Sequence, residues 1–131
     1  MSSWQPAAGG TLLMPSGPDG NHLFVVLNDP KVFDGYGARA HVVLVCVSSI
    51  RDGIPHDTTC ELEPGCHAFV KRPSYVVYRR SRIEAAKHLE KLVEQGVFKP
   101  HSPVSVALLH RMKRGLRASS FTSREFKELD F

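Results

Sequence analysis

The sequence lacks any apolar run that could cross a membrane. Its longest clean apolar run covers residues 42–47, whereas a spanning helix needs about 18 or more. The N-terminus lacks the basic and apolar regions of a signal peptide. Cysteine is scarce and odd in number, and Cys46 lies inside the apolar run, so a disulfide framework is not expected. These absences predict a soluble protein of the cytoplasm with no membrane partner.

The rest of the composition is ordinary for a folded protein, with 42% hydrophobic and 23% charged residues. The chain is long enough for one domain with its own core. We expect a disordered lead-in at 1–9 and a single domain over 10–131. The net charge of +4 and a pI near 9.2 mildly favour an anionic partner such as RNA, DNA or an acidic protein.

The first part of the domain, residues 10–80, is predicted to be β-rich. Turn residues separate short apolar or β-branched segments, which lie at 10–14, 22–27, 40–50, 67–71 and 74–79. The run at 42–47 does not alternate with polar residues, which predicts a central strand buried on both faces. Residues 51–65 form a long irregular loop, and loops of this length are usually functional or mobile.

From residue 81 the hydrophobic period changes to that of helices. Capping signals at Ser81, Ser102 and Thr122 predict three helices in 81–131, and Gly96 is the expected stop of the first. Alternating βαβ units are absent, which disfavours a doubly wound parallel sheet. We therefore predict an α+β fold with a small, strongly bent antiparallel β-barrel followed by C-terminal helices.

Residues 56–80 concentrate the polar side chains, and four interpretations of them stay open. Cys60, Cys66 and His67 offer zinc ligands, although their spacing fits no usual knuckle and we expect no bound metal. Either cysteine could act as a thiolate nucleophile. Asp57 and His67 could move protons at an RNA phosphodiester while Arg79 binds the phosphate. The same side chains could instead only stabilise the loop and the core.

Two basic tracts occur, at 71–82 and 110–117, with aromatic residues near both. Charge and base stacking are the means by which proteins bind single-stranded nucleic acid. The side chains that we expect to contact it are Lys71, Ser74, Tyr75, Tyr78, Arg79 and Arg80. For either tract alone, a solvated surface is the simpler interpretation, and cations near a helix C-terminus also complement its dipole.

The segments at 10–18, 22–27 and 43–50 are similar to the opening strands of small toxins of the MazF/PemK type. This resemblance, which covers about residues 10–80, implies an SH3-like barrel, often a homodimer. It also implies mRNA cleavage without metal or cofactor, and an antitoxin partner. In that family a catalytic arginine precedes the second long strand. Arg39 is the nearest match here, although it lacks the proline that follows the family's arginine.

We therefore predict a toxin-like protein that binds or cleaves RNA. Its expected catalytic residues are His67, Asp57 and Arg39, which should converge with Ser74 and Arg79 beside the long loop. A protein-binding module without catalysis, which uses the same loop face, is the alternative.

Overall fold

The computed structural model describes residues 4–131, apart from the side chain of Asp19. Within them, one sheet contains the strands β1 (Thr11–Pro15), β2 (Asn21–Val26), β3 (His41–Ser49), β4 (Glu61–Leu62), β5 (Ser74–Ala85) and β6 (Lys99–His101). Their order is β4-β5-β3-β2-β1-β6, and every pair is antiparallel. A 3-10 turn, η1 (Gly17–Asp19), joins β1 to β2. The helices are α1 (Ala86–Glu94), α2 (Val106–Ala118) and α3 (Arg124–Lys127).

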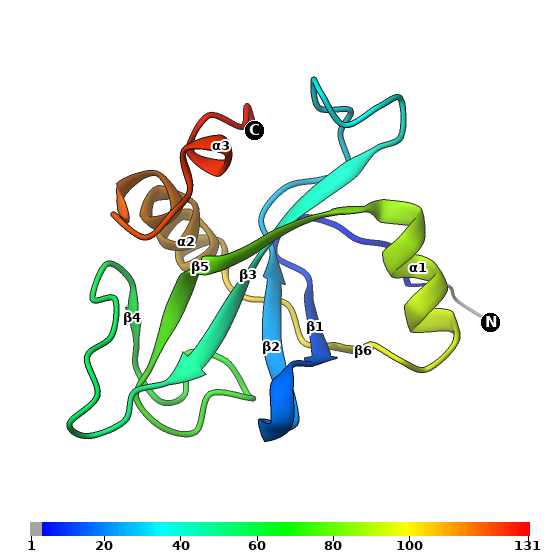
Figure 1. The fold of residues 1–131 in the computed structure, drawn as a ribbon. Helices are drawn as coiled ribbons and strands as arrows, with labels where there is room; N and C mark the ends of the chain where they lie inside the picture. The colour runs from blue at the N-terminus through cyan, green and yellow to red at the C-terminus, as the bar shows by residue number, and fades with distance from the viewer. Residues whose placement is uncertain (1–3) are drawn as a thin grey trace.

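The sheet is strongly curled into a half-barrel, because β5 bends where it crosses β3 (Figure 1). The pairing shifts register between Leu44, which faces Arg82, and Cys46, which faces Val77. Extra residues on one strand increase its local twist and bend it. The predicted α+β class, a strongly bent antiparallel sheet followed by C-terminal helices, is confirmed.

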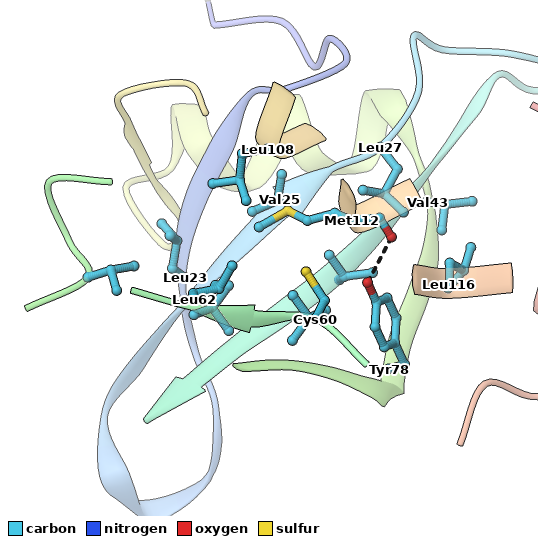
Figure 2. Close-up of a cluster of buried hydrophobic side chains, with 14 of the residues drawn as sticks. Leu23, Val25, Leu27, Val43, Cys60, Leu62, Tyr78, Leu108, Met112 and Leu116 are labelled. Carbon is cyan, nitrogen blue, oxygen red and sulfur yellow. Dashed lines mark hydrogen bonds between the residues drawn. The ribbon is translucent and has the colours of Figure 1, made fainter. Parts of the chain in front are cut away.

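The central strand β3 is buried on both faces, as its continuous apolar run predicts. Val43, Val45 and Val47 face a core under α2, together with Tyr78 and the helix residue Met112 (Figure 2). Their neighbours along β3 face a second core, which contains Leu89 of α1. Helices therefore cover both faces of the curled sheet.

The first helix begins five residues later than the sequence predicts. Residues 82–85 extend β5 and pair with residues 41–44 of β3, and the Ser81 hydroxyl donates to the carbonyl of Tyr78 rather than to a helix N-terminus. The non-local strand ladder thus outweighs the local capping signal. Helix α1 ends as predicted, since Gly96 follows it with a φ of 77°.

The second and third helices also start later than predicted. Ser105, not Ser102, caps α2 by accepting from the N–H of Leu108, since residues 99–101 pair with β1 as strand β6. Ser123 caps α3 through the N–H of Phe126.

The strand predicted at 67–71 is wrong. Val70 closes two turns there, because its N–H donates to the His67 carbonyl and its carbonyl accepts from Gly65. The two-residue strand β4 occupies the place beside β5 instead.

The predicted lead-in at 1–9 is described from residue 4 onward, and residues 1–3 lie outside the described part. Gly9 donates to the carbonyl of Val26 and accepts from the N–H of Val104, so it ties this segment to β2 and to the chain before α2. Within residues 4–131 no helix is both long and apolar enough to cross a membrane.

Candidate functional site

The end of β3 lies beside the beginning of β5 (Figure 1), and polar residues occupy both strand ends. Ser48 and Ser49 pair with Tyr75 and Ser74 there, and the loops on either side meet through a hydrogen bond of 2.9 Å from Ile50 to the carbonyl of Pro73. The strand register thus positions the predicted residues Ser74 and Tyr75 against the polar end of the central strand.

Two adjoining hollows at this end form what we call the basic groove. Their volumes are about 700 and 150 Å³, and both are lined by His22, Ser48, Ser49 and Arg51. The cations that line the groove are Arg51, Lys71, Arg72 and Arg80.

The described side chains that line the basic groove include cations but no carboxylate. In the described part of the chain, its four cations take part in no salt bridge. A concave surface with charge of one sign concentrates ligands of the opposite sign.

Phe69 and His101 form an aromatic wall of the groove. Phe69 is 39% exposed, and its ring lies edge-on to His101 with centroids 6.1 Å apart. The His101 ring in turn lies 4.9 Å from that of His67. Exposed rings beside cations are the combination on which unpaired bases stack.

His67 itself is 6% exposed, and backbone groups occupy both of its ring nitrogens. The N–H of Phe69 donates to Nδ1 at 3.0 Å, so the ring proton lies on Nε2, which donates to the carbonyl of Ser102 at 2.5 Å. This histidine therefore joins the loop before β5 to the chain before α2. Neither nitrogen is available to a ligand in this arrangement.

His22, like His101, lines the groove and was missed by sequence reasoning. Leu23 pairs with Val47, so the antiparallel register sets His22 opposite Ser48. Its Nδ1 is buried and has no hydrogen-bond partner among the described groups. A polar residue at the start of an otherwise apolar strand, opposite the Ser-Ser end of its neighbour, was the only available signal.

A separate, smaller pocket of about 220 Å³, which we call the Asp57 pocket, adjoins the basic groove. It shares Pro55, His56 and Tyr75 with the groove. The structure thus brings four predicted residues together, because the pocket is lined by Asp57, Tyr75, Tyr78 and Arg79. Phe121, which follows α2, completes the wall and is 53% exposed.

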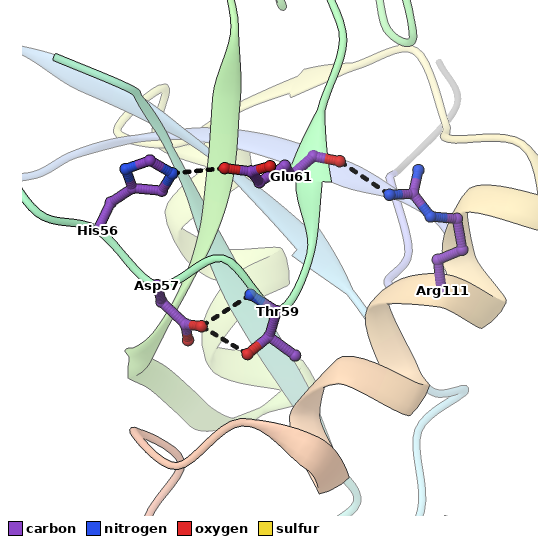
Figure 3. Close-up of polar contacts among 5 residues, drawn as sticks. All are labelled: His56, Asp57, Thr59, Glu61 and Arg111. Carbon is purple, nitrogen blue, oxygen red and sulfur yellow. Dashed lines mark hydrogen bonds and ion pairs between the residues drawn. The ribbon is translucent and has the colours of Figure 1, made fainter. Parts of the chain in front are cut away.

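Hydrogen bonds hold the Asp57 carboxylate in place (Figure 3). Oδ1 accepts from the backbone N–H of Thr59 at 2.9 Å and from its hydroxyl at 2.5 Å, and Oδ2 accepts from the Ser119 hydroxyl at 2.5 Å. Burial alone would raise the pKa of Asp57, but these bonds and nearby His56 outweigh it, so the pKa lies below its ordinary value. Asp57 is therefore ionised at neutral pH.

The pocket wall next to Asp57 is braced by Glu61 of β4 (Figure 3). Its carboxylate contacts Nε2 of His56 at 2.6 Å, and its backbone carbonyl accepts from the Arg111 guanidinium at 2.8 Å. The His56 ring also lies 5.0 Å from that of Tyr75. These contacts hold the loop that contains His56 and Asp57 against β5.

Arg39 does not join this group. It is exposed in the turn before β3 and lines a different hollow, together with Lys87 and Glu90 of α1. His41, two residues later, and Ser48 are seven residues apart along β3, which corresponds to roughly 20 Å.

Burial disfavours the cysteines as nucleophiles, and they belong to no metal-binding cluster among the described residues. All three are free thiols, and burial is the main cause that raises the pKa of each. Raised values disfavour the thiolate. Within residues 4–131 no three His, Cys, Asp or Glu side chains are placed to hold a metal ion.

The second basic tract, on α2, is used partly within the protein. Arg111 binds the carbonyl of Glu61, and Arg117 binds that of Lys127. Arg117 and Lys113 also lie over the ring of Phe131. This tract therefore anchors β4 and the C-terminal segment.

In comparisons with protein-family models, with curated proteins and with solved structures, no match to this chain was found. The resemblance to MazF/PemK toxins therefore depends on the opening segments of the sequence, and the fold agrees with it only at the level of a curled antiparallel sheet followed by helices.

Proposed function

We propose that the protein binds single-stranded RNA along the basic groove. The observation that carries this proposal is the set of cations Arg51, Lys71, Arg72 and Arg80 in a concave surface without described carboxylates. Phe69 and Tyr75 provide rings for stacking. Ser48 and Ser49 add hydroxyl groups that can bind the 2′-hydroxyl, by which proteins distinguish RNA from DNA.

The test is fluorescence anisotropy with a labelled RNA of about 12 nucleotides, within the range that small single-strand binders cover. With about four phosphate contacts, the slope of log affinity against log salt is about −2.8, so a rise from 50 to 200 mM NaCl weakens binding roughly 50-fold. The same strand as DNA, and an RNA duplex, are the competitors, and both should bind more weakly.

Matched lysine variants locate the binding surface. Lys71→Ala should weaken binding and reduce the salt slope by about 0.7. Lys87→Ala is the control, because Lys87 is exposed on α1 and pairs with Glu90 away from the groove. Equal effects of both variants, or binding that does not depend on salt, would contradict the proposal and favour a protein-binding module instead.

Cleavage of the bound RNA is a second candidate function, favoured by two histidines, His22 and His56, that line one hollow together with Arg51. In this proposal His22 takes the proton of a 2′-hydroxyl as its oxygen bonds to phosphorus and the bond to the 5′-oxygen breaks. Arg51 neutralises the charge on phosphorus, and His56, which lines the same hollow, gives a proton to the 5′-oxygen.

Incubation of the RNA with wild type and with His22→Ala tests cleavage. Wild type should leave 2′,3′-cyclic phosphate ends in the presence of EDTA, and His22→Ala should bind RNA without cutting it. His88→Ala, at an exposed position on α1, is the control. If wild type leaves the RNA intact, binding alone is the proposed function. In a separate experiment, growth arrest when the protein is expressed in bacteria would favour a toxin with an antitoxin partner.

A further inference from the structure

We infer that the Asp57 pocket binds one base of that RNA and selects bases that carry an exocyclic amino group, an inference that rests on the RNA-binding function proposed above. The pocket opens beside the basic groove, since His56 and Tyr75 line both. A strand held in the groove can therefore place one base in the pocket. Its volume of about 220 Å³ is below the roughly 300–1,000 Å³ of sites for drug-sized ligands, which fits a single heterocycle.

The walls of the pocket suit a flat ring. Tyr75, Tyr78 and Phe121 line it. Tyr78 is buried, so Tyr75 and Phe121 are the rings that a base can stack on, and Phe121 exposes 53% of its surface, although a ring of this size is usually buried. Recognition of single-stranded RNA commonly splays a base out and stacks it on such side chains.

The polar groups define which bases fit. A carboxylate can accept about four hydrogen bonds, and Asp57 already accepts three, from Thr59 and Ser119. One site on Oδ2 remains for a donor, and the three existing bonds hold it in a fixed direction. Arg79 lines the same pocket as the cationic donor.

Asp57 and Arg79 together match a base edge on which a donor lies next to an acceptor. The amino groups of adenine, cytosine and guanine each lie beside a ring nitrogen acceptor. Uracil also has a donor next to an acceptor, but its imide N–H lies between two carbonyl oxygens, so the oxygen that Arg79 does not bind would face the carboxylate unfavourably. Adenine, cytosine and guanine should therefore bind more tightly than uracil.

The test uses oligouridylate of about 12 nucleotides and the same strand with one central adenine, cytosine or guanine, with anisotropy measured at low salt. Each substituted strand should bind at least about fivefold more tightly than oligouridylate, the lower end of what a well-placed base contact gives. Asp57→Asn should reduce this preference and favour uracil, because the amide adds an N–H donor.

Phe121→Ala is the second variant, because its exposed side chain can be removed without disturbing the core. Loss of one stacked base should weaken binding of the adenine-containing strand roughly 5- to 150-fold. Val106→Ala is the control, since Val106 is 70% exposed at the opposite end of α2 and should leave binding unchanged.

The outcomes separate the two proposals. If all strands bind equally and Phe121→Ala has no effect, the base pocket is refuted while RNA binding in the groove stands. If wild type binds none of the strands at low salt, the RNA-binding function fails and the inference fails with it. If the preference persists in Asp57→Asn, the carboxylate is not the selecting group and the inference is overturned.

Discussion

Replacement of Gly115 by alanine should destabilise the protein, although alanine is the better helix former. Gly115 lies in α2 directly against the ring of Tyr78. A Cβ at this position would lie 2.6 Å from Cζ of Tyr78 and closer still to its hydroxyl oxygen. Tyr78 is 1% exposed, and its hydroxyl donates to the carbonyl of Met112 at 2.9 Å, so the ring has little room to move.

The expected loss of stability is the balance of one stabilising and two destabilising contributions. Helix propensity favours alanine over glycine by about 1 kcal/mol. Overpacking of a core by one methyl group costs about 1–3 kcal/mol, and a displaced hydroxyl that loses its buried partner costs about 1–3 kcal/mol more. The free energy of unfolding should therefore fall by about 1–5 kcal/mol, measured by urea denaturation.

Two further variants make this reasoning refutable. His110→Ala, at an exposed position in the middle of α2, should gain about 0.5 kcal/mol from propensity alone. Tyr78→Phe removes the hydroxyl that the new methyl group would strike, so the double variant with Gly115→Ala should lose about 1 kcal/mol less than the sum of the single variants. A Gly115→Ala variant as stable as wild type, or more stable, would refute the packing of Tyr78 against α2.

Two other predictions concern the candidate site. His67→Ala should lower the free energy of unfolding by about 2–3 kcal/mol, because two buried backbone groups lose their partner. The folded variant should still bind RNA. Loss of cleavage by a folded variant would contradict the structural role of His67. The lowered pKa of Asp57 means that its stabilisation is present above the ordinary value of 3.8 and is lost as pH falls below it. As the pH is lowered from about 5 to 2, the urea midpoint should therefore fall more steeply for wild type than for Asp57→Asn. Parallel pH profiles of the two proteins would contradict the stabilising role of the Asp57 carboxylate.

The sequence predicts the central part of the fold because the relevant signals are strong and local. A run of β-branched residues without alternation has few stable positions other than a strand covered on both faces. That property places β3 in the middle of the sheet, where Val45 faces one core and Cys46, on the opposite face of the strand, faces the other. The stop at Gly96 is equally local, since glycine readily adopts a positive φ.

The elements that were missed depend on partners distant in sequence. Residues 82–85 contain a helix-start signal, yet β3 offers them a complete strand ladder. Strand β6 contains Pro100 and polar neighbours, and proline is tolerated only because this strand lies at the edge of the sheet. No local pattern distinguishes such a segment from a loop.

The difference between local and long-range signals also explains which residues of the candidate site were predicted correctly. Asp57, Tyr75, Tyr78 and Arg79 lie near each other in the sequence, and the loop returns Asp57 to the start of β5. Arg39 was placed there through a resemblance between strands, but the length of β3 separates it from them.

His22 reaches the groove only because β2 pairs with β3, and Phe121 reaches the Asp57 pocket because Ser119 binds Asp57 across 62 positions. Each is a long-range consequence of the curled sheet. The bend in β5 buries Tyr78 and leaves Arg79 and Arg80 exposed, with Arg79 lining the pocket and Arg80 the groove. The proposed phosphate-binding groove and the proposed base pocket are therefore linked through one strand. This link is why Gly115→Ala, which acts on Tyr78 from behind the pocket, should alter base preference more than it alters the salt dependence of RNA binding.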